Sequence, residues 1–273
     1  MEQAVTASEQ TIIQTNKLCK TFSTGGVQQH VLKNLDLSIN RGDFTVIMGA
    51  SGAGKSTLLY ALSGMDKPTL GKVAFDGRDI TALSNDRLAV FRRKNCGFIF
   101  QQIYLMDNMS LMDNVLASGL LVSRDRKALA QRARELFGQV GLSEQDWRKF
   151  PAQLSGGEAQ RGAVVRALIN KPAVLFADEP TGALNSTSGT AVLDLLTQIS
   201  RDGQSVVLVT HDIRSACRGN RVLYLQDGSL QGELDLGWYE EEGIRAKAGD
   251  DIENDTVVRR TERLRGFLAD RGW

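Results

Sequence analysis

A glycine-rich segment, Gly49–Thr57, constrains the fold of this chain more than any other feature of its sequence. It reads GASGAGKST, follows an apolar run at 44–48 and precedes a predicted helix at 58–63. Glycines let a backbone turn tightly and approach a ligand closely, and a helix that begins directly afterwards points its positive end at the loop. The sequence therefore predicts a strand, a tight anion-binding loop and a helix, in this order.

The spacing G-x-x-x-x-G-K-S within this segment is that of a P-loop, which holds the phosphates of a nucleotide. In such a loop Lys55 pairs with the β- and γ-phosphates, and the Ser56 hydroxyl is a ligand of Mg²⁺. The alternative, an incidental glycine-rich turn, is disfavoured because the full motif stands between a strand and a helix. We assign nine residues to nucleotide binding: Gly49, Ala50, Ser51, Gly52, Ala53, Gly54, Lys55, Ser56 and Thr57.

Short apolar runs elsewhere predict further strands, and they alternate with helical patterns. The runs lie at 73–75, 97–100, 174–177 and 206–209, and alternation at Leu35, Leu37 and Ile39 indicates one more strand. Apolar residues between 130 and 140 have helical spacing, so a helical insertion is expected at about 102–170. Strands that alternate with helices predict an α/β fold with a parallel sheet covered on both faces.

Net charge, cysteine spacing and the length of apolar runs disfavour several classes of protein. The 273 residues include 33 Lys or Arg and 32 Asp or Glu, and a net charge of +1 does not favour nucleic acid as a partner. The three cysteines are far apart and form no C-x-x-C pair, which is typical of reduced thiols in a cytosolic protein. No apolar stretch approaches the roughly 20 residues of a membrane span, and no signal peptide is recognisable at residues 1–10. Any membrane role would therefore need a partner that enters the membrane.

A P-loop alone leaves kinases, GTPases and motor ATPases open, and four further segments discriminate among them. Together with the P-loop they stand in the order found in ATP-binding cassette (ABC) proteins, which this chain resembles over about residues 12–232. The segments are LSGGE at 154–158 with Gln160-Arg161, similar to the signature motif; VLFADEP at 174–180, similar to Walker B; VTHD at 209–212, similar to the switch segment; and Gln101, at the Q-loop.

The resemblance implies a RecA-like P-loop cassette with an antiparallel β edge subdomain and a helical signature subdomain. It also implies that Asp178, Gln101 and Ser56 lie at Mg²⁺, that Glu179 activates water, and that His211 senses the γ-phosphate of ATP. An apolar strand that ends in two carboxylates places them at the carboxyl edge of a parallel sheet, where ligands bind. The alternatives are a capped or salt-bridged turn for Glu179 and a core histidine for His211.

The signature motif implies a second copy of the chain. Ser155, Gly156 and Gly157 head a predicted helix, and in the family this end closes over the ATP held by the other subunit. Glu158 replaces the commoner Gln, and we expect its side chain to face away from the phosphates. Asn185 stands where the family usually has Asp, so the negative charge is lost although hydrogen bonding is kept.

Phe22 stands where the family places an aromatic residue, usually Tyr, that stacks on adenine. A phenylalanine keeps the stacking and loses the phenol hydrogen bond. The alternative is that Phe22 is a residue of the core.

Segments at 79–84, 88–93, 97–101 and 178–184 are similar to the ATPases of the lipoprotein-release, macrolide-export and antimicrobial-peptide-resistance group. That resemblance implies a motor that drives a membrane-spanning permease subunit from the cytoplasmic face of the membrane. Residues Ile103–Val115 would then receive the coupling helix of the permease, or else pack in the core. A soluble or division-signalling ABC ATPase is the alternative function.

The chain changes character after about residue 236, where we expect the cassette (1–236) to end. Residues 237–273 are expected to form an acidic linker and a basic helix with Val257, Leu264 and Leu268 on one stripe. This helix carries five arginines: Arg259, Arg260, Arg263, Arg265 and Arg271. They would form a solvated face or attach the chain to anionic lipid or to the permease. Removal of the residues after Gly237 is expected to leave the ATPase chemistry intact, because every nucleotide motif lies earlier.

Overall fold

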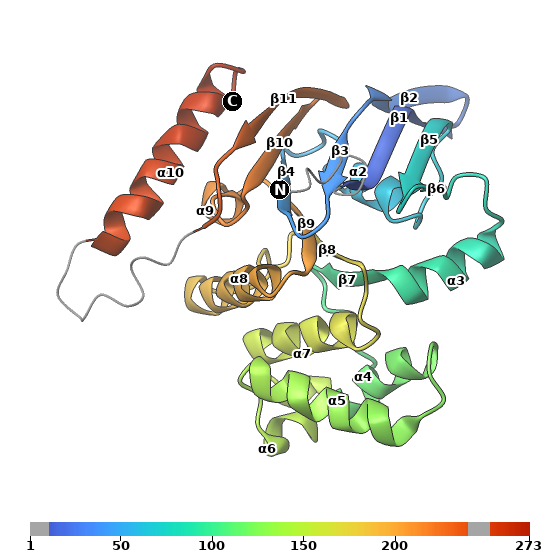
Figure 1. Cartoon of the computed structure of the whole chain (residues 1–273), viewed down its shortest axis with the longest axis vertical. Helices are drawn as coiled ribbons and strands as arrows, with labels where there is room; N and C mark the ends of the chain where they lie inside the picture. Colours follow the sequence, from blue (N-terminus) through green and yellow to red (C-terminus); the bar gives the residue numbers. More distant parts are fainter. Residues whose placement is uncertain (1–10, 240–251) are drawn as a thin grey trace, which may run out of the picture. The chain divides into compact units, whose positions relative to one another are not determined.

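The computed structural model describes residues 11–239 and 252–273, which belong to two compact units. Unit 1 contains residues 1–82 and 207–273, and unit 2 contains residues 83–206. Figure 1 shows the helices and strands with their labels. The acidic linker expected around 240–251 lies outside the described residues.

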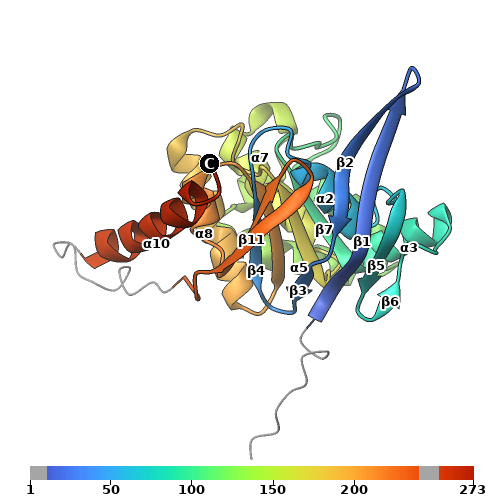
Figure 2. The same ribbon diagram turned by 90° about the horizontal axis from the view of Figure 1, so that it is seen from above.

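Unit 1 contains an antiparallel sheet with the strand order β2-β1-β5-β6, in which β3 also pairs with β1. Its strands are β1 (Thr11–Thr24), β2 (Val27–Leu35), β3 (Ser38–Asn40), β5 (Leu70–Phe75) and β6 (Arg78–Asp79). The hairpin of β1 and β2 projects beyond the other strands of this sheet (Figure 2), and most residues of β2 are exposed. This sheet agrees with the expected antiparallel edge.

One strand expected from alternation across Leu35, Leu37 and Ile39 is interrupted. β2 ends at Leu35 and β3 begins at Ser38. The reason is a side-chain bridge from β1, in which the Thr15 hydroxyl donates to the Leu35 carbonyl at 2.8 Å and accepts from the Leu37 amide at 3.0 Å. These bonds satisfy the backbone of the bend, so both flanking strands stay paired with β1.

The second sheet of unit 1 has the order β11-β10-β4-β9 and carries the glycine-rich segment at the end of β4. β4 (Phe44–Met48) and β10 (Arg221–Gln226) are parallel, and β10 forms an antiparallel hairpin with β11 (Ser229–Asp235). β9 (Ser205–Thr210) begins at the last two residues of unit 2. Every residue of β4 and β9 is buried, which is typical of parallel strands covered on both faces.

In the part of unit 1 that the structure describes, the helices are α2 (Lys55–Leu62), α9 (Ile213–Ala216) and α10 (Ile252–Ala269). Unit 2 is mainly helical, and the segment 102–170, where a helical insertion was expected, lies within it. Its elements are α3 (Asn85–Asn95), β7 (Cys96–Phe100), α4 (Leu111–Leu120), α5 (Arg126–Gln139), α6 (Glu144–Trp147), η1 (Pro151–Gln153), α7 (Gly156–Leu168), β8 (Val174–Asp178) and α8 (Ser186–Arg201).

In unit 2, β7 and β8 are parallel neighbours that bring the predicted Q-loop and Walker B segments side by side. Phe100 is paired with Asp178 in this register, and the Phe98 and Phe176 rings stack with centroids 5.7 Å apart. The five longer helices of the unit begin at side-chain caps, in which a side-chain oxygen accepts from the backbone N–H three residues on. The caps of α3, α4, α5, α7 and α8 are Ser84, Ser110, Asp125, Ser155 and Asn185. Over the described residues, the helices are all too short or too polar to span a membrane.

Candidate functional site

The glycine-rich loop joins β4 to α2, as predicted, and two of its glycines are sterically required. A Cβ at Gly49 would lie 2.2 Å from the Leu225 carbonyl oxygen, and one at Gly54 would lie 2.9 Å from the Val31 carbonyl oxygen. Gly54 also has a φ of 98°, a backbone conformation that favours glycine, and it stands at the N-cap of α2. The backbone of unit 1 therefore permits this close turn only with glycine at both positions.

Lys55 is held against the start of the same loop. Its side chain is 8% exposed, and its Nζ donates hydrogen bonds to the carbonyl oxygens of Gly49 at 2.8 Å and Ala50 at 2.9 Å. These two hydrogen bonds keep the charge of the buried ammonium group close to the N-terminus of α2. This is the combination of cation and helix end that favours a phosphate.

Two further candidates belong to unit 1, and neither is a core residue. Phe22 lies on β1 in the projecting hairpin, its side chain is 42% exposed, and the Lys20 ammonium lies 5.0 Å from the ring centroid. His211 directly follows β9 and is exposed. Exposure excludes the alternatives of a core phenylalanine and a core histidine. An exposed aromatic ring is free to stack, and an exposed imidazole at a strand end can contact a ligand.

The two carboxylates of unit 2 follow a fully buried strand, as expected. Asp178 ends β8 and is buried, and Glu179 has a φ of 45°. Non-glycine residues seldom adopt this left-handed conformation, and such strain is concentrated at functional sites. The Gly182 amide donates to the Glu179 carbonyl at 3.0 Å, which closes a tight turn behind Asp178-Glu179-Pro180.

The Q-loop residue lies against this turn. A Cβ at Gly182 would come within 2.9 Å of the Gln101 Nε2 atom, so the Gln101 side chain packs directly on the Gly182 backbone. The structure of unit 2 therefore brings together Gln101, which follows β7, and the turn that holds Glu179. Asp178 and Phe100, the residue before Gln101, are register partners in the same pair of strands.

Gln160, which sequence reasoning noted only as part of a motif, connects three predicted segments. It is buried on α7, and its Nε2 donates to the Phe100 carbonyl at 3.1 Å and to the Pro180 carbonyl at 2.8 Å. The signature helix is thus bonded to the residues next to Gln101 and Glu179. The sequence shows that Gln160 lies two residues after LSGGE. It does not show that the Gln160 side chain donates to two backbone carbonyls.

We predict that Gln160→Met lowers the free energy of unfolding by about 1–3 kcal/mol, because the buried Pro180 carbonyl and the half-buried Phe100 carbonyl lose their donor. It should also lower the rate of ATP hydrolysis, because the turn behind Glu179 loses an anchor. Urea unfolding and steady-state hydrolysis measure the two effects. Gln198→Met, at an exposed position of α8, is the matched control and should change neither quantity. Equal behaviour of the two variants would show that the Gln160 bonds are unimportant.

The start of α7 forms a capping box around the predicted signature serine. The Ser155 amide donates to Glu158 Oε2 at 2.7 Å, and the Glu158 amide donates to the Ser155 hydroxyl at 3.3 Å. Glu158 also lies 3.7 Å from the Lys149 ammonium, which pairs with Asp146 at 2.7 Å. The Glu158 carboxylate is therefore turned back onto its own helix, while Ser155 is exposed.

These bonds predict how acid affects unit 2. The Ser155 amide, then the Ser155 side chain and the Lys149 charge, hold the pKa of Glu158 below its ordinary value. A carboxyl with a lowered pKa in the folded state contributes stability above its unfolded pKa, and that contribution is lost as pH falls through the lowered value. Glu158→Gln should therefore reduce the loss of stability between about pH 6 and pH 3. Urea unfolding across this range checks the prediction.

Glu135→Gln, at an exposed position of α5, is the control for the Glu158 experiment because no comparable capping contact surrounds it. It should leave the pH dependence as in the wild type. The same acid sensitivity in all three proteins would contradict the capping account.

Asn185 caps the next helix of unit 2. Its Oδ1 accepts from the Ser188 amide at 2.8 Å at the start of α8, so this oxygen serves as the helix cap within the chain. A Cβ at Gly156 would lie 3.3 Å from Leu184, and one at Gly157 would lie 2.9 Å from the Ser188 hydroxyl. The signature glycines therefore allow α7 to begin close to this cap.

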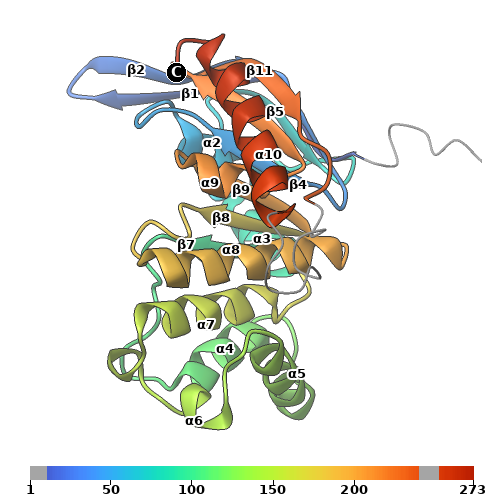
Figure 3. The same ribbon diagram turned by 90° about the vertical axis from the view of Figure 1, so that its left-hand side faces the viewer.

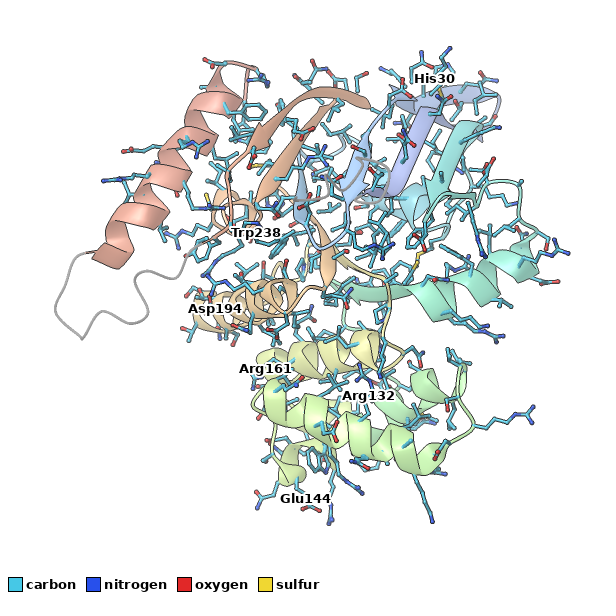
Figure 4. All side chains as sticks on the ribbon, in the orientation of Figure 1. His30, Arg132, Glu144, Arg161, Asp194 and Trp238 are labelled. Atoms are coloured by element: carbon cyan, nitrogen blue, oxygen red, sulfur yellow. The ribbon has the colours of Figure 1, made fainter. Side chains whose placement is uncertain are left out.

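The predicted residues thus form two groups. The P-loop, Phe22 and His211 belong to unit 1, whereas Gln101, Asp178, Glu179, the 155–158 segment and Asn185 belong to unit 2. Figure 4 shows all described side chains on the ribbon, with Arg161 on α7 and Arg132 on α5 as guides to the signature region. In the described residues, His, Cys, Asp and Glu form no cluster of three or more that could hold a metal.

Comparisons with known proteins assign this arrangement to a family. The sequence profile described as ABC transporter matches residues 32–182. The chain is 42% identical to a macrolide export ATP-binding/permease protein MacB of Wolinella succinogenes over 219 residues, which are 80% of this chain and 34% of that protein. It is 40% identical to an uncharacterised ABC transporter ATP-binding protein of Methanocaldococcus jannaschii, of which it covers 97%.

A solved structure supports the same assignment. The dimeric cassette MJ0796, described as a post-hydrolysis state bound to ADP and Pi, matches with a TM-score of 0.77 and 38% identity over 84% of this chain and all of that one. The chain belongs to the ABC transporter ATP-binding family and has its mixed α/β cassette fold. It accordingly contains the ATPase domain of ABC transporters. It spans about a third of the length of the macrolide export relatives.

Proposed function

We propose that this chain is the ATP-hydrolysing motor of a transporter and that it dimerises head to tail on MgATP to drive a membrane-spanning permease subunit. The proposal rests on the presence of all the family's sequence motifs in this chain. It rests also on a P-loop whose backbone requires glycine at two positions and on the strained backbone of Glu179 directly after a buried strand. Each part of the proposal rests on residues of its own.

In this proposal the nucleotide is held by unit 1. The backbone amides of Gly49–Thr57 and the start of α2 surround the phosphates, and the Lys55 ammonium exchanges its carbonyl partners for the β- and γ-phosphates. Phe22 stacks on the adenine ring. Its exposed position on the hairpin supports this role.

The donor set of the chain fits Mg²⁺ bound together with the nucleotide. Mg²⁺ prefers hard oxygen ligands and is commonly held by one or two carboxylates, a hydroxyl and substrate phosphates, with water completing the shell. Ser56 supplies a hydroxyl, Asp178 a carboxylate and Gln101 an amide oxygen. When bound, the ion would neutralise charge on the phosphate oxygens.

Glu179 is proposed to accept the proton of the attacking water, and His211 to contact the γ-phosphate. The strained turn closed by Gly182 supports the first assignment, because it fixes the carboxylate-bearing residue directly after the buried strand. The exposed imidazole at the end of β9 supports the second. A positioned general base typically contributes about 10²- to 10⁴-fold to the rate.

A second copy of the chain is proposed to complete the site. Ser155 is exposed at the N-terminus of the 13-residue helix α7, where an anion is favoured. The similarity to a cassette described as dimeric supports this arrangement. Asn185 would meet the other copy through hydrogen bonds, without the usual negative charge.

The transport role rests on the macrolide export relatives, whose name combines an ATP-binding part with a permease. We propose that a separate permease docks on the segment Ile103–Val115, which places the chain at the cytoplasmic face of a membrane. Tyr104 and Met106 in this segment are exposed apolar residues, which suits a docking surface. Export, lipoprotein release and peptide-antibiotic resistance are the proposed kinds of task.

Purification of the tagged chain from detergent-solubilised native membranes tests the transport role. A polytopic membrane protein should co-purify and change the rate of ATP hydrolysis. Replacement of Tyr104 and Met106 with serine should reduce its recovery. Recovery of ATPase activity with no membrane protein, in either form of the chain, would instead favour a soluble ABC ATPase.

A further inference from the structure

The C-terminal helix is docked on unit 1. α10 runs alongside β11 and α9 (Figure 3), and Leu264 and Leu268 are buried against the unit. Trp273, the last residue, packs its ring edge-on against Tyr224 of β10 with centroids 5.9 Å apart. The helix was expected from its apolar stripe and is present, although Val257 of that stripe is 37% exposed.

Arg260 differs from the solvated or anchoring face that was expected of the five arginines, whereas Arg259, Arg263 and Arg265 are exposed and Arg271 follows the end of α10. Arg260 is only 5% exposed, and its guanidinium donates to five backbone carbonyls. Nε donates to Cys217 at 2.9 Å, and Nη2 donates to Gly219 at 2.7 Å. Nη1 lies within 3.2 Å of the carbonyl oxygens of Leu236, Gly237 and Trp238. Arg263 and Arg271 also donate to backbone carbonyls, of Asp235 and Gln231 respectively.

The first two acceptors of Arg260 lie at the end of the short helix that follows His211. α9 begins at Ile213 and is capped by Asp212, whose Oδ2 accepts from the Ser215 amide at 2.8 Å and from the Ser215 hydroxyl at 2.7 Å. The Asp212 amide in turn donates to the Thr210 hydroxyl at 3.0 Å. The residues on both sides of His211 are therefore fixed to α9, and α9 is fixed to Arg260.

Gly219, one of these two residues, is close to the strand that leads into the P-loop. A Cβ at Gly219 would lie 2.7 Å from the Phe44 carbonyl oxygen, so the two backbones are in contact. The next residue, Asn220, accepts from the Phe44 amide at 2.7 Å and donates to Asp43 at 3.0 Å. Arg260 thus holds the short connection from the His211 segment to β10, and this connection abuts the beginning of β4.

We infer that Arg260 is a positioning residue for His211, and that α10 is a strap which sets the rate of ATP hydrolysis from outside the nucleotide motifs. The inference rests on the proposed function of His211 as the γ-phosphate contact. It contradicts the expectation that the tail is dispensable for the ATPase chemistry. Loss of the guanidinium leaves the α9–β10 connection without its donor, so the imidazole takes up a wider range of positions.

Only arginine fits these five acceptors. Its planar guanidinium carries five N–H donors in a fixed fork, whereas a lysine ammonium has three donors on a flexible stem. Burial lowers the pKa of Arg260 from its ordinary value, and the group nevertheless stays protonated because arginine does not lose its proton in proteins. Arg260→Lys therefore keeps the charge and removes the geometry.

The histidines of the chain allow a direct readout that does not depend on turnover. There are two, His211 and His30, and His30 lies on the β1–β2 hairpin, where its Nδ1 is 2.9 Å from the Thr21 hydroxyl. Figure 4 labels His30 on this hairpin. Imidazole NMR signals of the full chain therefore report the His211 segment and an internal reference at the same time.

Arg260→Lys should shift or broaden the His211 signals and leave those of His30 unchanged. In the same protein kcat for ATP should fall about tenfold, while KM changes by less than about twofold, because the P-loop is intact. Leu264→Ala loosens the same helix and keeps the guanidinium, so it should produce a smaller change of the same kind. Arg265→Lys, at an exposed position of α10, is the matched control and should alter neither readout.

Unchanged His211 signals and unchanged kcat in both Arg260→Lys and Leu264→Ala, with thermal unfolding as in the wild type, would overturn the inference. Movement of both histidines together, or equal losses for Arg260→Lys and Arg265→Lys, would show a general structural effect and overturn it as well. A wild-type chain that binds ATP and does not hydrolyse it would refute the proposed function instead. In that case the His211 signals still decide whether Arg260 positions this residue.

Discussion

Replacement of Glu179 with glutamine is expected to lower kcat for ATP hydrolysis by about 10²- to 10⁴-fold while ATP binding is kept. Glutamine preserves the size of the side chain and the turn closed by Gly182, but it cannot accept the proton of water. The residues of the phosphate-binding loop belong to unit 1 and are themselves unchanged. Steady-state hydrolysis and binding of a fluorescent ATP analogue measure the two quantities.

The glutamine variant should also accumulate as a dimer with ATP, because the nucleotide that holds two copies together is no longer consumed. Size-exclusion chromatography with light scattering checks this. Glu135→Gln, exposed on α5, is the matched control and should behave as the wild type. Turnover of the Glu179 variant within about threefold of the wild type would refute its assignment as the general base.

Replacement of Lys55 with alanine is expected to weaken ATP binding about 10- to 100-fold or more, because charge-assisted hydrogen bonds to phosphate contribute about 1.5–3 kcal/mol each. The loop itself should persist, because its turn depends on Gly49 and Gly54. Isothermal titration of the isolated chain with ATP measures the affinity. Lys94→Ala, exposed on α3, is the control and should bind ATP as the wild type does.

Ser155→Ala should behave differently from Lys55→Ala, since the serine is proposed to act on the ATP of another copy. The affinity of a monomer for ATP should be unchanged, and ATP-dependent dimerisation and hydrolysis should be lost. Similar losses of ATP affinity in dilute monomers of both variants would contradict a site shared between two subunits.

The parts of the fold that could be predicted from sequence are the strands that consist of continuous runs of apolar residues. β4, β8 and β9 are continuous buried runs and lie where they were expected. The β1–β2 hairpin was not predicted, because β2 is largely exposed and shows no regular alternation. α3 was missed for a related reason, since Leu88 is its one buried residue.

α8 was also not predicted. Its buried face includes Gly189, Thr197 and Ser200 beside Val192, Leu193 and Leu196, so the apolar stripe is diluted by small and polar residues. Residues of this kind are buried only because other elements pack against them, and the pattern of apolar residues in the sequence does not show which elements these are.

The candidate site could be predicted to the level of residue types, while its supporting contacts could not. The glycines, Lys55 and the Asp178-Glu179 pair follow from motif spacing, and the structure adds the close approaches and the strained φ that explain them. Gln160 and Arg260 act through backbone carbonyls distant in the chain. Any residue has a carbonyl, so no sequence pattern identifies these partners in advance.

The dependence of specific ATPase activity on protein concentration tests the central proposal most directly. If the site is completed by Ser155 of a second copy, the activity per milligram of the wild-type chain should rise with concentration and reach a plateau when dimers dominate. Added Ser155→Ala protein should not support this rise as well as wild-type protein does. Activity per milligram that is constant from dilute to concentrated solution, with no ATP-dependent dimer, would contradict the account.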